Sequence, residues 1–234
     1  MHGFESDQFI FYTAGKIGTR TLMYTHGVTD LTRTGIISGS IRKNPLEIIV
    51  ARKEITNKKI IVLVRDPVSR FNSGLFELIC KIMGGQYITR ILSDGGNLTY
   101  LNDPTFWETV LEQCMRFSPN VWSPNVEFDS QRWQYHIGNW LLDAETVSGI
   151  FADSVILNIE DLSDFLKSNG MPVSHLNTYS SIFPKDYDTK KVFDAFIQGL
   201  ELLPDRVSQV NNYLAPEKEC YQRLINSPQY YKVG

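Results

Sequence analysis

The sequence predicts an α/β protein with three layers, in which a central parallel sheet is flanked by helices. Three short apolar runs, rich in β-branched or aromatic residues, are expected to be buried strands. They lie at 8–12, 59–64 and 154–159. Helix-forming segments follow these strands, and continuous apolar strands that alternate with helices are typical of a parallel sheet covered on both faces.

Turn residues and apolar spacing predict the other elements of the N-terminal third. Thr13-Ala14-Gly15 ends the first strand, and a helix is expected from Thr19 to about residue 26. A further short strand is expected at 34–38. Pro45 suits the first turn of a helix, which should run to about residue 55.

A long helix is expected after Pro67, because apolar residues recur there at helical spacing. They are Phe71, Leu75, Leu78, Ile79 and Ile82. Gly84-Gly85 should end this helix, and 93–103 should be a loop. Later helices are expected at 104–117 and 160–167, the second ending at 169–172, whereas 118–130 fits no element. The C-terminal third should be mostly helical.

Composition sets the class of protein. The chain has 234 residues, of which 42% are hydrophobic and 21% are charged, and its net charge is 23 − 26 = −3. This length predicts a single domain over 1–234, and the apolar content excludes a disordered or fibrous protein. A general nucleic-acid binder would usually be basic, so nucleic acid is not an expected partner.

No targeting or membrane segment is expected. The first residues are acidic where a signal peptide is basic, and the apolar run at 60–64 is far too short to span a bilayer. Cys80, Cys114 and Cys220 are far apart and odd in number, so neither a zinc site nor a disulfide framework is expected. We therefore expect a cytoplasmic protein with no membrane partner and no metal.

The first segment whose residues suit the binding of an anion follows the first strand. A strand, a loop with two glycines and a helix N-terminus direct backbone N–H groups toward one anion. Lys16 adds a positive charge, and Thr19 and Thr21 add hydroxyl donors. The expected phosphate contacts are Gly15, Lys16, Ile17, Gly18, Thr19, Arg20 and Thr21. The alternative is an ordinary strand-turn-helix connection with a solvated lysine.

The second such segment follows the strand at 59–64. Arg65 comes where this strand ends, and open α/β sheets bind ligands at the carboxyl ends of their strands. Ser69, Ser73 and Glu77 share one face of the following helix, so Arg65 and Ser73 can converge on one phosphate. The alternative is that Asp66 caps the helix and Ser73 is simply exposed.

Together the two segments resemble the sulfotransferases that use 3′-phosphoadenosine 5′-phosphosulfate (PAPS). Lys16-Ile17-Gly18-Thr19 is similar to the family's 5′-phosphosulfate loop, and Arg65-Asp66-Pro67 with Ser73 is similar to its 3′-phosphate motif. The resemblance implies a P-loop-like fold and transfer of a sulfuryl group from PAPS to a hydroxyl, or less readily an amine, without a metal. Weaker similarities at 155–162, 175–181 and 213–221 favour the carbohydrate branch, and thus a carbohydrate acceptor.

At the expected catalytic base this chain departs from the family pattern. Carbohydrate members often have a His where this chain has Arg132, and His136 lies one helical turn further on. His136 is therefore the candidate base beside the catalytic Lys16, although an ordinary half-buried histidine is an equal alternative. Further candidates are Glu47, Glu77, Glu127 and Asp129.

Two other functions stay open. A P-loop kinase needs Gly-x-x-x-x-Gly-Lys-Ser/Thr, but Ile10 stands in place of the first glycine and Ile17 in place of the hydroxyl residue that holds Mg²⁺. A relic of the sulfotransferase family that binds PAP, the desulfated product, without catalysis is the other alternative.

Overall fold

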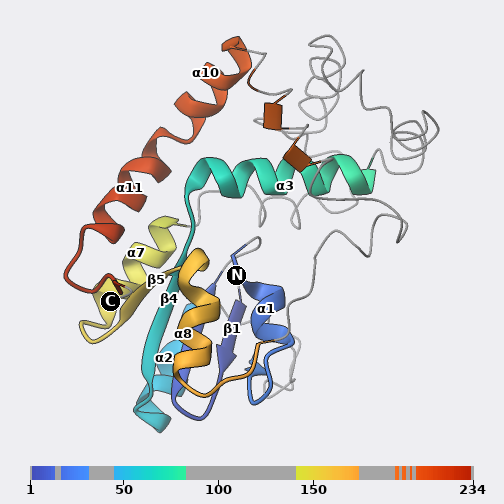
Figure 1. Ribbon diagram of the computed structural model, residues 1–234. Coiled ribbons are helices and arrows are strands. Elements are labelled where there is room, and N and C mark those ends of the chain that lie inside the picture. Colours follow the sequence, from blue (N-terminus) through green and yellow to red (C-terminus); the bar gives the residue numbers. More distant parts are fainter. Residues whose placement is uncertain are drawn as a thin grey trace, which may run out of the picture. The chain divides into compact units, whose positions relative to one another are not determined.

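The computed structural model describes residues 2–13, 17–31, 45–82, 141–173, 193–194, 197–198, 201 and 204–232. Figure 1 shows the sheet and helices that these residues form. The chain divides into two compact units. The first contains residues 1–70, 139–176 and 216–234, and the second contains 71–138 and 177–215.

A five-stranded sheet in the order β3-β1-β2-β4-β5 forms the centre of the first unit. The strands are β1 (His2–Glu5), β2 (Phe9–Thr13), β3 (Thr29–Asp30), β4 (Lys59–Val64) and β5 (Val155–Asn158). β2, β4 and β5 are parallel neighbours, whereas β1 pairs antiparallel with both β2 and β3. Four strands therefore run in one direction and β1 runs against them. The α/β class is confirmed, with a mostly parallel sheet instead of the fully parallel one expected.

Helices cover both faces of this sheet. On one face, α8 (Leu162–Ser168) packs on β2, where the rings of Phe165 and Phe9 are 5.2 Å apart. On the other face, α2 (Pro45–Thr56) packs on β1 and β2, and α7 (Leu141–Ile150) packs on β4. Figure 1 shows α8 in front of the sheet and α2 behind it. All residues of β4 after Lys59 are buried, as expected for a central parallel strand.

Most helix starts agree with the sequence patterns. α2 begins at Pro45, and α3 (Pro67–Ile82) begins at Pro67. α1 (Thr19–Met23) ends before the expected residue 26, because the chain turns at Gly27 to enter β3. The helix expected at 160–167 is a 3₁₀ turn, η2 (Ile159–Asp161), followed by α8. The segments expected at 34–38, 84–85, 93–103, 104–117 and 118–130 lie outside the described residues.

The chain from residue 204 to 232 is helical and then extends the sheet. α10 (Pro204–Tyr213) is followed by α11 (Ala215–Ile225). The chain then runs beside β5, where Ile156 accepts from the amide of Tyr231 (2.8 Å) and donates to the carbonyl of Gln229 (3.0 Å). The outer edge of β5 is thereby covered, which satisfies backbone groups that an edge strand would expose.

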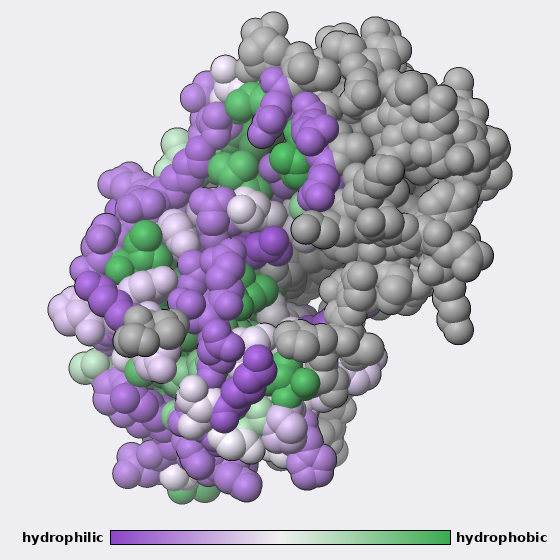
Figure 2. Space-filling view, in the orientation of Figure 1, coloured by the Kyte–Doolittle hydropathy of each residue, from purple (hydrophilic) through white to green (hydrophobic). Residues whose placement is uncertain are grey.

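The coloured part of the face in Figure 2 carries no large apolar area. Hydrophilic residues dominate the coloured part of this face, and hydrophobic ones form small separate groups. Scattered apolar residues of this kind are normal on a protein surface. Of the helices in the described ranges, none has both the length and the apolar character to cross a membrane.

Candidate functional site

Three parallel strands end at the same edge of the sheet, and the segments that follow them form the candidate site. β2 is followed by the loop that leads to α1, β4 by Arg65 and α3, and β5 by η2. Val64 and Asn158 are register partners, so the ends of β4 and β5 are level. Ligands of open α/β sheets bind at such a carboxyl edge.

The loop after β2 is closed by its own hydrogen bond. The hydroxyl of Thr13, the last residue of the strand, donates to the carbonyl of Ile17, and both residues are buried. This bond brings the two ends of a short loop together at the strand terminus. Gly15 and Lys16, within the loop, lie outside the described residues.

Gly18 makes this connection specific for glycine. Its φ of 64° lies in the left-handed region, which L side chains rarely adopt. A Cβ atom here would also lie 2.6 Å from Cδ2 of Leu162 in α8. A side chain here would therefore require both a strained backbone and a shift of Leu162. Thr19, Arg20 and Thr21 follow in α1 and are all half-buried.

Arg65 is half-buried directly after β4, with its Nε atom buried. The next residue, Asp66, caps α3, because its Oδ1 accepts from the amide of Ser69 at 2.7 Å. This is the N-cap geometry with proline at the first helical position. The capping part of the alternative interpretation is therefore confirmed, but Ser73 is buried and not exposed. Ser73 belongs to the second unit, whereas Arg65 belongs to the first.

Two further polar residues of this edge come from α11, and sequence reasoning gave them no role. Glu217 forms a fully buried ion pair with Arg70 in the first turn of α3. The hydroxyl of Tyr221 accepts from Nδ2 of Asn158, the last residue of β5, at 2.9 Å. Both residues lie on the buried face of α11. A charged and a polar residue four positions apart, beside the apolar Cys220 and Leu224, were the available sequence signal.

Electrostatics keep the Tyr221 hydroxyl protonated. Burial raises its pKa to about 12, and the charges of Glu160 and Asp66 add to the rise. These two carboxylates follow β5 and β4, so Tyr221 lies near both strand ends. A protonated hydroxyl at this place can donate a hydrogen bond as well as accept one.

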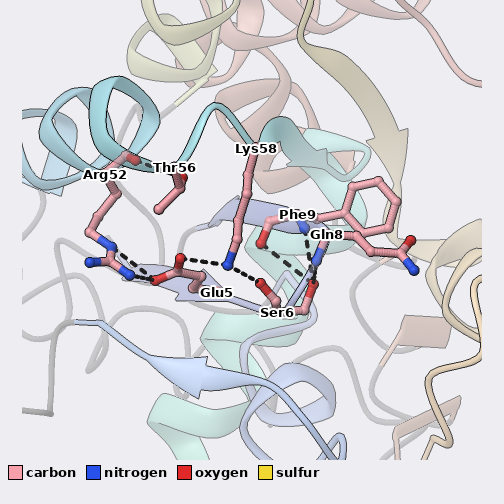
Figure 3. A network of polar contacts seen from close by, with 7 residues as sticks. All are labelled: Glu5, Ser6, Gln8, Phe9, Arg52, Thr56 and Lys58. Atoms are coloured by element: carbon pink, nitrogen blue, oxygen red, sulfur yellow. Dashed lines mark hydrogen bonds and ion pairs between the residues drawn. The ribbon is translucent and has the colours of Figure 1, made fainter.

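A cluster of charged side chains lies at the end of β1, at the opposite edge of the sheet (Figure 3). Glu5 accepts from Nε of Arg52 at 2.9 Å and from Nζ of Lys58 at 2.8 Å. Burial alone would raise the pKa of Glu5, but the hydrogen bonds from Lys58 and Arg52 outweigh burial and hold it below its ordinary value. Lys58 also donates to the carbonyl of Ser6 (2.7 Å). This cluster connects α2 to the turn between β1 and β2.

Of the candidate bases, Glu47 alone has a side chain among the described residues. Glu47 is exposed in the first turn of α2. His136, Glu127 and Asp129 lie outside the described residues, as does the side chain of Glu77. Within the described ranges, no group of three or more His, Cys, Asp or Glu residues could hold a metal ion.

Comparison with known proteins finds no match for this chain. Neither a protein-family model, nor a curated protein, nor a solved structure matches the chain.

Proposed function

We propose that this protein is a PAPS-dependent sulfotransferase that transfers a sulfuryl group to a hydroxyl of an acceptor, with a carbohydrate as the favoured class. One observation supports the proposal more than any other. β2 and β4 are adjacent parallel strands, followed by Ile17-Gly18-Thr19 and by Arg65 respectively. Two groups suited to phosphate thus follow neighbouring strand ends, at the edge where open α/β sheets generally bind ligands.

The proposed roles follow from charge and geometry. Lys16 and the loop amides neutralise the charge that develops on the bridging oxygen and the leaving phosphate. Arg65 holds the 3′-phosphate, which distinguishes PAPS from ATP. His136 removes the proton of the acceptor hydroxyl as the hydroxyl oxygen attacks sulfur in line. The sulfur–oxygen bond to the phosphate breaks, and PAP leaves.

Calorimetric titration tests the donor site. We expect the full chain to bind PAP in the micromolar range without metal, and to bind ATP with Mg²⁺ much more weakly. The opposite preference would favour the kinase alternative, and no binding of either nucleotide would contradict both.

Turnover separates an active enzyme from a relic. PAPS is supplied with a panel of hydroxyl acceptors, and sulfated product is measured. Lys16→Ala should nearly abolish transfer while PAP binding remains measurable, because Lys16 acts mainly on charge that develops during the reaction. Unchanged turnover in this variant would remove Lys16 from the mechanism, and PAP binding with no transfer to any acceptor would favour the relic.

A further inference from the structure

α11 contacts the segments that follow two neighbouring strands of the sheet. Glu217 and Tyr221 lie four positions apart on its buried face, so both side chains point to the same side. Glu217 reaches the start of α3, which follows β4, and Tyr221 reaches the end of β5. The helix therefore bridges the carboxyl ends of β4 and β5.

The contact at β4 is a buried ion pair. Nη2 of Arg70 donates to both carboxylate oxygens of Glu217, at 2.7 and 2.9 Å, and neither side chain is exposed. The amide of Arg70 donates to the carbonyl of Asp66 (2.9 Å), the residue that caps α3. Glu217 thus holds the helical turn that begins directly after Arg65.

The contact at β5 has a similar form. Asn158 donates to the hydroxyl of Tyr221 through Nδ2, and its Oδ1 accepts from the amide of Glu160 (3.4 Å). Asn158 thereby caps η2, and Tyr221 holds the side chain of Asn158 in place. At each strand end a polar residue starts a helical turn, and one residue of α11 stabilises that turn.

A buried ion pair contributes little net stability compared with apolar side chains of similar size, since desolvation offsets the attraction. Its orientation is nevertheless strict, because a buried carboxylate must keep its partner. We propose that Glu217 and Tyr221 are positioning residues, which set the direction of the chain after β4 and β5 and so the place of Arg65 at the phosphate site. The part that concerns phosphate rests on the proposed function.

The double variant Arg70→Met with Glu217→Leu tests this proposal in the full chain. It replaces the ion pair with apolar side chains, so the unfolding midpoint should stay close to wild type. Amide hydrogen exchange in 65–70 should become about tenfold faster as the first turn of α3 loosens. The dissociation constant for PAP should rise about tenfold. Tyr221→Phe should accelerate exchange at 158–161 and leave 65–70 less affected.

The pair Glu145 and Arg223 supplies a matched control. Arg223 also lies on α11, but its partner is in α7 and both side chains are partly exposed. Glu145→Gln with Arg223→Gln should change neither exchange at the strand ends nor PAP binding.

The two readouts separate the two proposals. Unchanged exchange at 65–70 in a folded double variant would overturn the positioning role, whether or not PAP binds. If the double variant does not fold, unchanged exchange at 158–161 in Tyr221→Phe would overturn it instead. Faster exchange in a protein whose wild type binds no PAP would support positioning and contradict the proposed donor.

Discussion

Arg65 is the residue on which the proposed donor site most depends. Its side chain follows β4 at the carboxyl edge of the sheet, and a hydrogen bond to a charged group contributes roughly 1.5–3 kcal/mol. Arg65→Ala should weaken PAP binding by about that amount in calorimetry. Arg52→Ala removes an arginine at the opposite edge, beside Glu5, and should leave the affinity unchanged. Equal affinity in wild type and Arg65→Ala would refute the assignment of the 3′-phosphate.

Gly18 allows the cost of close packing to be separated from the cost of backbone conformation. Gly18 and Gly27 both have positive φ, but only Gly18 has a neighbour within 3 Å of an added Cβ. Gly27→Ala should cost about 1–2 kcal/mol from the left-handed backbone alone. Gly18→Ala should cost clearly more, because Leu162 must also move. Chemical denaturation measures the free energy of unfolding of both variants. Equal losses would mean that Leu162 in α8 moves aside without an energetic cost.

Gly149 completes this series as a helical glycine without close neighbours. Its φ is not positive and an added Cβ would meet nothing within 4 Å. Gly149→Ala should therefore stabilise the protein by roughly 0.5–1 kcal/mol, because alanine loses less backbone entropy in a helix. A destabilised Gly149→Ala variant would contradict this open environment.

Residues close together in sequence were predictable, and distant partners were not. Asp66-Pro67 is a local signal, because an N-cap and a proline at the first helical position act on adjacent residues. Arg70 and Glu217 are 147 positions apart. No pattern within one helix shows which distant carboxylate will be buried against it, so the ion pair required the folded chain.

At the scale of elements, burial decided what the sequence could predict. β4 matches its expected range, and β2 and β5 differ from theirs by one residue at each end, because these strands are continuous apolar runs. β1 was missed, since His2-Gly3-Phe4-Glu5 has mixed polarity and depends on β2 as its partner. β3 has only two residues and no local signal. Weak strands of this kind form because a neighbouring strand offers hydrogen bonds.

The Glu5 cluster, which joins α2 to the β1–β2 turn, should make stability depend on acid. The folded-state pKa of Glu5 lies below the ordinary value of 4.5, so the unfolded chain binds more protons in this range. The stabilisation is complete well above pH 4.5 and is lost as the pH falls through the folded-state pKa. Urea unfolding at decreasing pH should show this loss, and Glu5→Gln should remove that part of the pH dependence.

Lys58→Met tests the cause of the lowered pKa of Glu5 in the same cluster. Removing Lys58 takes away a hydrogen bond that lowers the pKa of Glu5, while burial continues to raise it. The acid-induced loss of stability should then be smaller than in wild type and should end at a higher pH, because the folded-state pKa moves toward the unfolded one. A larger acid-induced loss would contradict the assigned cause.

At the scale of the whole molecule, the first unit is assembled from three separate chain segments. Residues 216–234 belong to the same unit as the strands β1, β2 and β4. They contribute Cys220, Tyr221 and Leu224 to its core. The stability of this unit is therefore expected to depend on residues 216–234. Neither the composition nor the periodicity of the sequence indicates this dependence.

Truncation after residue 226 tests that dependence. It removes the residues that bond β5 on its outer edge, together with Tyr231, whose ring stands edge-on to Phe165 at 5.4 Å. It also removes the Gln229 side chain, which donates to the carbonyl of Ala152 (3.1 Å) in the turn before β5. Two backbone hydrogen bonds and one aromatic pair predict a loss of about 2–4 kcal/mol in the free energy of unfolding. Removing only residues 233–234 keeps all these contacts and should change nothing. Equal stability of both truncated chains would show that β5 does not need this tail.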